Sequence, residues 1–380
     1  MRILYCITHM YNSGGMERVL TQKVNWLAAH TKHELTIITT ERTPEGMNEC
    51  YFALDKRVQV VALNIDFNAD YHKPLLAKWF GHMHRMRTYK HALNEYIHAH
   101  KTDLCISLCG KEIAFLHTLP CRTVAELHFA KDQRRQLLEA NHKGHFWSLL
   151  GRIRTWQLVR AVKPLERLVV LTNEDKKAWE EAGCKNVIWI PNPCSLDGQK
   201  VPMKPKKTTV LSIGRLHEQK GFDLLLRAWK TVESVHPELS LRIVGEGERR
   251  TALEKQIRDT GLQNVCIAGR IEDVANEYAE ASLFVLSSRY EGFSLVLSEA
   301  MWCRVPCVAF DCPHGPSELL ADGRGWLVPN GDTDALAQQI IYATEHPEEA
   351  TERAHKAQVY AQETYSEAAI MPQLEKIIEQ

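Results

Sequence analysis

Long apolar runs are missing from the 380-residue sequence. A helix that spans a membrane needs about eighteen or more consecutive apolar residues, so we expect no membrane span. The opening run from Met1 to His9 is too short and too interrupted for a signal peptide, and no small-residue cleavage site follows it. We therefore expect a cytoplasmic protein.

Net charge is absent as well, since 47 Lys and Arg residues balance 47 Asp and Glu residues. The balance hides a split, because residues 1–200 carry 28 basic and 20 acidic side chains, whereas residues 201–380 carry 19 and 27. Halves of opposite sign indicate two domains with different partners. The basic half is the candidate for contact with an anionic surface.

The eleven cysteines lack the pattern of a disulfide framework or a zinc site. Their number is odd, and the Cys105/Cys109 and Cys303/Cys307 spacings differ from those of common zinc knuckles. We interpret them as free thiols in a reducing compartment.

Short β-branched runs alternate with longer segments of helical periodicity. The expected helices include residues 17–30, 88–100, 147–162, 222–235, 248–260 and 295–303, and a helical tail from about residue 345. The expected strands comprise residues 2–8, 34–40, 58–63, 104–108, 122–127, 167–171, 187–190, 209–213, 240–244, 265–268, 283–286, 306–309 and 325–327. Such alternation is typical of parallel sheets covered on both faces, and each half has enough strands for one sheet.

The pattern predicts an α/β fold of two doubly wound domains, whose ligand crevices lie at the carboxyl ends of the strands. A cleft between the domains follows if those ends face each other. We place the first domain at residues 1–195, a Pro- and Lys-rich linker at 196–207, the second domain at 208–360 and a final helix at 361–380. A nicotinamide-dependent dehydrogenase shares this plan, but neither residues 12–15 nor residues 245–247 supply its three spaced glycines.

The segment 287–301 carries the most informative chemistry. A strand ends there, a loop holds Glu291 and Gly292, and a helix begins near Ser294, a preferred N-cap residue. Backbone N–H groups at a helix start bind phosphate or sugar hydroxyls. Glu299 lies a little over one turn inside the helix, where its carboxylate can accept paired hydrogen bonds from vicinal hydroxyls. Considered alone, the two acids are better explained as ordinary surface carboxylates.

Two further strand ends carry groups suited to a phosphate. After residue 213, Arg215 and Lys220 offer two cations that could clasp a diphosphate, although two solvated surface charges are the alternative. After the first strand, Gly14 and Gly15 let the backbone approach a ligand before a helix begins.

Together these residues resemble the retaining glycosyltransferase family 4. The resemblance covers nearly the whole chain and is strongest over residues 209–329. The matching residues are Gly14, Gly15, Glu17, Arg18, Gly214, Arg215, Leu216, Lys220, Gly221, Val244, Gly245, Glu246, Gly247, Glu291, Gly292, Phe293, Glu299, Pro316, Glu318, Asp322, Gly323, Gly325, Leu327 and Val328. The family implies the GT-B fold, in which two Rossmann-like domains face each other across a cleft and a C-terminal helix returns to the first domain.

The resemblance also implies roles for particular positions. Arg215 and Lys220 hold the donor diphosphate, Glu299 binds the ribose hydroxyls, and Glu291 contacts the transferred sugar. We do not assign Glu291 as a nucleophile, because sequence does not show attack geometry. Further donor contacts fall on Gly14, Gly15, Gly214, Gly245, Gly292, Phe293, Ser294 and Leu295, with Arg270 and Ile271 at the nucleobase.

His128, at a strand end, matches the family's histidine near the reacting carbon, although a lone histidine is more often structural. With Glu291, Arg215 and Lys220 it completes the expected catalytic set.

No metal or other cofactor is expected, because members of this family lack the Asp-x-Asp metal motif of other glycosyltransferases. One such triplet occurs here at residues 332–334. We interpret it as the acidic first turn of a helix, where carboxylates suit the helix dipole.

Two basic, aromatic-rich stretches in the first half bear on the acceptor. Residues 71–101 hold six Lys and Arg and one acid, and residues 131–167 hold nine and three. Within residues 147–162, apolar side chains alternate with Arg152, Arg154 and Arg160, which suits an anionic membrane surface. A helix packed on its own sheet with a solvated basic face is an equal alternative. Nucleic acid is not expected, because no recognised binding motif accompanies the charge.

The sequence therefore predicts a metal-independent retaining transferase that moves a hexose or N-acetylhexosamine from a nucleotide sugar, UDP rather than GDP, to a surface glycan or lipid-linked acceptor. It would act in the cytoplasm, with peripheral attachment to the inner face of the membrane left open. A phosphorylase or sucrose-type synthase is an alternative with the same fold. A non-catalytic sugar-nucleotide-binding subunit is the alternative from another class.

Overall fold

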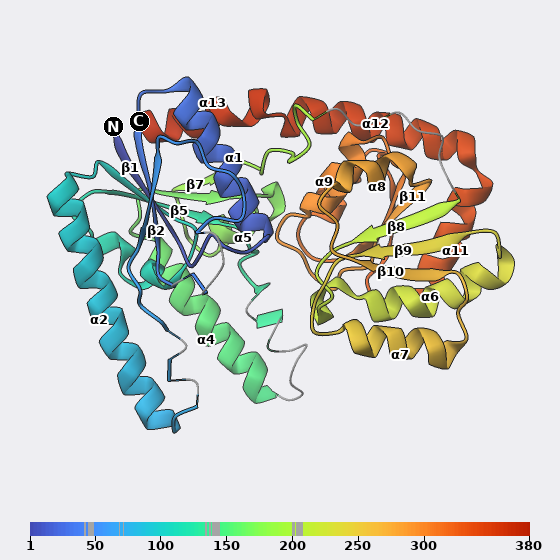
Figure 1. Cartoon of the computed structure of the whole chain (residues 1–380), viewed down its shortest axis with the longest axis horizontal. Helices are drawn as coiled ribbons and strands as arrows, with labels where there is room; N and C mark the ends of the chain where they lie inside the picture. The colour runs from blue at the N-terminus through green and yellow to red at the C-terminus, as the bar shows by residue number, and fades with distance from the viewer. Residues whose placement is uncertain are drawn as a thin grey trace. The chain divides into compact units, whose positions relative to one another are not determined.

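The computed structural model describes residues 1–41, 43–44, 49–67, 69–70, 72–133, 135–136, 138, 145–199, 202 and 208–380. It comprises two compact units: in Figure 1 the first is coloured blue to green and includes the red end of the chain, and the second is coloured green to red. The first unit consists of Met1–Ile190 and Met371–Gln380, and the second consists of Pro191–Ile370. Most of the linker expected at 196–207 lies outside the described residues.

The first unit contains a seven-stranded parallel sheet in the order β3-β2-β1-β4-β5-β6-β7. Its strands are β1 (Arg2–Ile7), β2 (Glu34–Thr39), β3 (Val58–Ala62), β4 (Leu104–Ser107), β5 (Arg122–Leu127), β6 (Arg167–Val170) and β7 (Val187–Trp189). The connecting helices are α1 (Gly15–His30), α2 (Leu75–His100), the 3-10 turns η1 (Lys111–Ala114) and η2 (Leu116–Thr118), α4 (His145–Val162) and α5 (Asn173–Glu181).

The last helix, α13 (Glu367–Glu379), ends in the first unit. Arg122 of β5 donates to the carbonyl oxygen of Ile378 at 2.8 Å and forms an ion pair with Glu166 at 2.7 Å. These contacts fix the end of the chain to the sheet of this unit.

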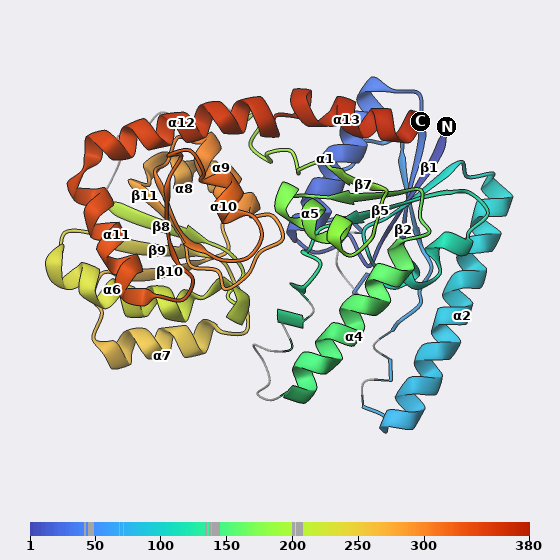
Figure 2. The same cartoon turned by 180° about the vertical axis from the view of Figure 1, so that it is seen from behind.

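The second unit contains a six-stranded parallel sheet in the order β10-β9-β8-β11-β12-β13. Its strands are β8 (Thr209–Ile213), β9 (Ser240–Val244), β10 (Val265–Gly269), β11 (Leu283–Leu286), β12 (Cys307–Asp311) and β13 (Trp326–Pro329). Its helices are η3 (Glu218–Lys220), α6 (Phe222–Val235), α7 (Arg250–Thr260), α8 (Val274–Glu280), α9 (Leu295–Trp302), α10 (Pro316–Leu319), α11 (Thr333–Glu345) and α12 (Pro347–Tyr365). Figure 2 shows the same two units from behind.

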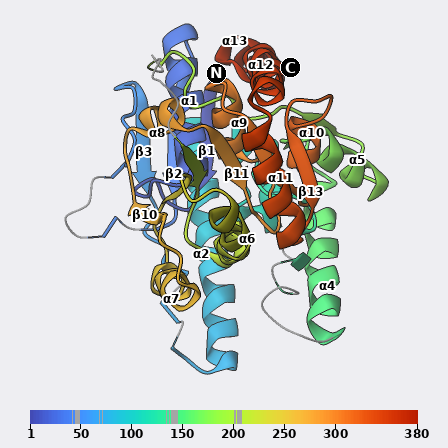
Figure 3. The same cartoon turned by 90° about the vertical axis from the view of Figure 1, so that its right-hand side faces the viewer.

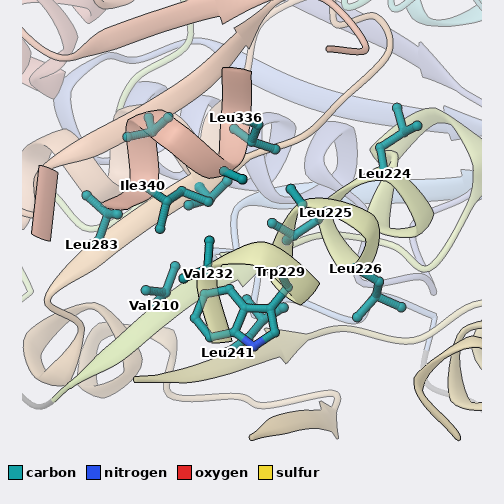
Figure 4. Close-up of a cluster of buried hydrophobic side chains, with 14 of the residues drawn as sticks. Val210, Leu224, Leu225, Leu226, Trp229, Val232, Leu241, Leu283, Leu336 and Ile340 are labelled. Atoms are coloured by element: carbon teal, nitrogen blue, oxygen red, sulfur yellow. The ribbon is translucent and has the colours of Figure 1, made fainter. Parts of the chain in front are cut away.

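The core of the second unit is built around Trp229 of α6, which is fully buried. It belongs to the same cluster as Val210 of β8, Leu241 of β9 and Ile340 of α11 (Figure 4). Burial of large side chains at this density keeps the strands and their loops in fixed positions. The core therefore gives the loop after β8 a rigid base.

Each expected strand coincides with an observed strand, which confirms the alternating pattern. The main difference is α2, which begins at Leu75 and not near residue 88. Buried Tyr89, Leu93 and Ile97, four residues apart, produce the helical pattern that the sequence reveals. The earlier turns of α2 lack such a core-facing pattern.

All eleven cysteines are free thiols, as expected, and Cys266 of β10 is the one that is exposed. Within the described residues, no helix combines the length and apolarity needed to cross a membrane.

Candidate active site

The candidate donor site of the second unit lies at the carboxyl end of its sheet, where β8 has β9 on one side and β11 on the other. The direction of winding changes at this point, and ligands of doubly wound sheets bind at such switch points. The loop after β8 carries Arg215 and Lys220, and the loop after β11 carries Glu291. Because β8 and β11 are paired, these loops begin side by side.

Close contacts fix the two loops to each other. Gly221 has a φ of 62°, and a Cβ there would lie 2.0 Å from the carbonyl oxygen of Ser287, so only glycine fits. The Ser287 hydroxyl donates to the carbonyl oxygen of Lys220 at 2.9 Å. Arg289 donates from both terminal nitrogens to Asp223 at 2.8 Å. Burial disfavours the Asp223 carboxylate, but these bonds outweigh burial and lower its pKa.

Lys220 and Glu291 form an ion pair at the junction of the two loops. Lys220 Nζ donates to Glu291 Oε1 at 2.7 Å, and the Ser288 hydroxyl donates to the same oxygen at 2.6 Å. Glu291 is 4% exposed. An ammonium group has three N–H donors, so Lys220 can hold this carboxylate and still donate to a phosphate. The structure therefore brings together the residue predicted to hold the diphosphate and the residue predicted to contact the sugar.

The start of α9 offers unsatisfied donors beside this pair. Ser294 is the N-cap residue, as predicted, but its side chain makes no capping hydrogen bond. Its hydroxyl is buried and has no hydrogen-bond partner in the part of the chain that the structure describes. The first N–H groups of a helix also lack intrahelical partners. With buried Phe293 and half-buried Gly292 and Leu295, the helix start combines anion-binding groups with apolar surface.

Glu299 is held by two hydroxyl groups. Ser195 donates to its Oε1 at 2.5 Å and Tyr278 donates to its Oε2 at 2.9 Å. Glu299 is 2% exposed, so it is not an ordinary surface carboxylate, which was the alternative in the sequence analysis.

Arg215 is exposed, and its guanidinium has no hydrogen-bond or ion-pair partner among the described residues. Burial raises the pKa of Tyr290 and the charge of Arg215 acts against this rise, so Arg215 lies close to the loop after β11. A Cβ on Gly245 would lie 1.9 Å from the carbonyl oxygen of Gly214, so this glycine lets the loop after β9 pack on the loop after β8. Exposed Arg270 follows β10, two strands away, with Ile271 beside it.

In the first unit, the glycines predicted to meet the diphosphate lie at the start of α1. Gly14 is the N-cap residue, and a Cβ there would lie 2.2 Å from Glu17 Oε2. Glu17 Oε1 lies 3.0 Å from His9 Nδ1, and this contact raises the pKa of His9. The Glu17 carboxylate thus occupies the space beside Gly14, and an anion bound at Gly14 and Gly15 would compete with it.

His128, which follows β5, has a side chain that is only 4% exposed. Its Nε2 lies 2.9 Å from Glu126 Oε1, and the same oxygen accepts a hydrogen bond from Lys23 of α1. Burial disfavours the Glu126 carboxylate, but attraction from Lys23 and His128 is stronger and holds its pKa well below the ordinary value. The histidine is therefore part of a buried charged group.

The acidic triplet at 332–334 has the structural role expected from the sequence. Asp332 is the N-cap of α11 and accepts hydrogen bonds from the backbone N–H groups of Asp334 and Ala335.

Three residues that hold the predicted carboxylates were missed by the sequence reasoning. Ser288 precedes Glu291 by three residues in the same loop, so its place after a strand was an available signal. Ser195 and Tyr278 reach Glu299 from distant segments, and no local pattern marks them.

Comparison with known proteins finds a family match within the second unit. Residues 196–363 match the model for glycosyl transferases group 1. An uncharacterized glycosyltransferase of Haemophilus influenzae is 26% identical over 100% of this chain and 98% of its own length.

A Campylobacter jejuni protein is 28% identical over 90% of this chain and 88% of its own length. It is named GalNAc-alpha-(1->4)-GalNAc-alpha-(1->3)-diNAcBac-PP-undecaprenol alpha-1,4-N-acetyl-D-galactosaminyltransferase. The crystal structure of a TarM mutant from S. aureus, in complex with Fondaparinux, alpha-GlcNAc-glycerol and UDP, superposes with a TM-score of 0.77. That chain is 16% identical, and the match covers 100% of both chains.

Proposed function

We propose that the chain, which has the GT-B fold and matches the group 1 model over residues 196–363, is a retaining glycosyltransferase of family 4. It transfers a hexose or N-acetylhexosamine from a nucleotide sugar, UDP in preference to GDP, to a glycan or lipid-linked acceptor. The observation that carries this proposal is the Lys220–Glu291 pair between two strand-end loops, beside the unsatisfied start of α9.

These groups suit the chemistry of a departing diphosphate. In the proposed reaction, an acceptor hydroxyl oxygen forms a bond to the anomeric carbon on the face from which the diphosphate leaves. The bond between that carbon and the phosphate oxygen breaks, its electron pair goes to the diphosphate, and the diphosphate takes the acceptor's proton. Arg215, Lys220 and the N–H groups of α9 offset the charge that develops. This supply of positive charge supports the proposal that no metal is needed.

In this proposal, two carboxylates bind different parts of the nucleotide sugar. Glu299, whose oxygens already accept from Ser195 and Tyr278, receives the ribose hydroxyls. Glu291, fixed by Lys220, faces the transferred sugar. His128 is assigned to the neighbourhood of the reacting carbon, with its orientation set by Glu126.

Similar proteins support the substrate classes. The name of the Campylobacter relative gives an N-acetylgalactosamine transfer to an undecaprenol-linked glycan. The TarM structure contains UDP. We therefore infer a UDP-sugar donor, an acceptor on a lipid carrier, and action at the cytoplasmic face of a membrane in surface polysaccharide or lipopolysaccharide synthesis.

The test is calorimetry with UDP, GDP and ADP, followed by incubation with the corresponding sugars and NMR of the product. We expect UDP to bind best, slow hydrolysis of the UDP-sugar without acceptor, product with the donor's anomeric configuration, and no loss of turnover in EDTA. Nucleotide binding without any hydrolysis or transfer would instead support a non-catalytic subunit. An inverted product would refute retention.

A further inference from the structure

Large apolar side chains face solvent on the early turns of α2 and along much of α4, both in the first unit. Of the fourteen exposed large apolar side chains in the described part of the chain, eight lie there. They are Leu76, Trp79, Phe80 and Met83 on α2, and Phe146, Leu149, Ile153 and Trp156 on α4.

On each helix these side chains form one stripe. The spacings of three, four and seven residues place them on a single face. The core-facing side of α4 is formed by other residues, including buried Leu158 and Val162. Phe146 is 68% exposed and Trp156 is 59% exposed, so the stripe on α4 is not packed against the sheet. α4 therefore packs on the core through Leu158 and Val162, as that alternative expects, and also carries a second apolar face that this packing leaves exposed.

The two stripes lie at the same end of the unit. Both helices contact η1, and Figures 1 and 3 show α2 and α4 running alongside each other below the sheet of this unit. Each connects parallel strands, so each begins at the carboxyl edge of that sheet. The pKa of His82 on α2 is lowered by burial and by the charges of Lys111, Arg154 and Arg85, which shows that Arg154 of α4 acts on α2.

Apart from Glu95 near the end of α2, the charges on these helices are positive. Residues 75–94 carry four Lys and Arg and no acid, and α4 carries Arg152, Arg154 and Arg160 and no acid. Neither first turn has an acidic residue, although the helix dipole favours one there. One of the cations, Arg85, forms an ion pair with Asp70. Aromatic side chains at the tip with cations beside them fit an anionic bilayer surface.

We propose that the early turns of α2 and the exposed apolar face of α4 together dock the first unit on an anionic membrane, with both stripes inserted among the lipid headgroups. The lipid-linked acceptor of the proposed function would then be met where its carrier lies, and the role of the docking surface rests on that proposal. The docking itself does not depend on it. The first half of α2, which the sequence did not reveal as helix, is as much part of this surface as α4.

Co-sedimentation with vesicles tests the surface. The vesicles contain either phosphatidylcholine alone or phosphatidylcholine mixed with phosphatidylglycerol. The α2 variant is Trp79→Ser with Phe80→Ser, and the α4 variant is Phe146→Ser with Trp156→Ser. The matched control is Val235→Ser with Val359→Ser, which removes exposed apolar side chains from the second unit.

We expect the wild type to bind the mixed vesicles much more strongly than the neutral ones. Each aromatic variant should lose affinity for the mixed vesicles by about tenfold or more, because it no longer gains the free energy of burying large apolar side chains in the bilayer. Replacing Arg152, Arg154 and Arg160 by Glu should lower affinity for the mixed vesicles by about fivefold or more per residue. The control variant should bind like the wild type.

Three results would overturn the proposal: wild type that stays in the supernatant at low salt, an α2 variant that binds normally, or a control variant that loses binding equally. Sedimentation velocity without vesicles covers the remaining possibility, since concentration-dependent dimerisation that the aromatic variants abolish would assign the stripes to a second copy. Hydrolysis of the UDP-sugar without vesicles separates the two proposals. Vesicle binding without hydrolysis would support membrane docking and refute the proposed transferase activity. Hydrolysis without vesicle binding would refute docking and leave the proposed activity supported.

Discussion

The buried ion pair between Lys23 and Glu126 gives the most demanding prediction for stability. The two side chains are 1% and 2% exposed, and Glu126 also lies beside His128. Lys23→Met keeps the length and apolar stem of the lysine and removes its charge. The carboxylate then remains buried beside His128 without the charge of Lys23.

Removing one partner of a buried pair costs about 3–5 kcal/mol, because an uncompensated charge stays in the interior. For a unit of this size, each kcal/mol lowers the melting temperature by about 2–4 °C. We therefore expect the thermal transition of the first unit to fall by roughly 10 °C. The measurement is differential scanning calorimetry, with urea unfolding for the free energy.

The matched control is Lys176→Met on α5, which removes a cation from the half-exposed pair with Glu180, whose charged atoms lie 3.8 Å apart. Pairs of this kind contribute about 0–1 kcal/mol. Equal losses in Lys23→Met and Lys176→Met would show that burial of the charge does not set the cost, and our reasoning would be wrong.

The pH dependence provides a second check on the same pair. The pKa of Glu126 is depressed in the folded state, so its contribution to stability is present above the unfolded value of about 4.5 and is lost as the pH falls through the folded value. In Lys23→Met, burial acts with less opposition, and protonation relieves the buried charge at a higher pH. The difference in unfolding free energy between the two proteins should therefore shrink in acid.

Further predictions concern the second unit. Lys220→Ala and Arg215→Ala should each weaken UDP binding by about 1.5–3 kcal/mol in calorimetry, the value of a hydrogen bond to a charged group, and unchanged affinity in both would exclude the clasp. Glu299→Ala should weaken binding of free UDP, whereas Glu291→Ala should largely spare it and abolish transfer to acceptor; the opposite pattern would exchange their roles. Asp332→Ala should cost about 1 kcal/mol in urea unfolding through loss of an N-cap, and turnover should be unchanged, whereas a large loss of turnover at unchanged stability would indicate a metal ligand.

Patterns with short sequence separation were predictable. Strand ends followed by Gly214 or Gly292 mark the loops at the carboxyl edge, because turns and helix starts are determined locally. The N-cap role of Asp332 was predictable for the same reason.

Contacts that depend on tertiary packing were not predictable. Lys220 and Glu291 are 71 residues apart, and only the pairing of β8 with β11 brings them together. Ser195 approaches Glu299 across 104 residues. The early turns of α2 were missed although Leu76, Trp79, Phe80 and Met83 have helical spacing, and the structure shows that this apolar face meets solvent and not the core.

The exposure of Cys266 has a practical consequence. The other ten thiols are buried or half-buried, and burial raises the pKa of Cys50 and raises that of Cys121 to about 11, which slows their alkylation at neutral pH. A maleimide fluorophore added to the unmodified protein should therefore react first at Cys266, on the edge strand of the second sheet and four residues before Arg270. The chain thus carries a natural labelling position near the segment assigned to the nucleobase, and nucleotide binding can be followed optically without first removing any cysteine.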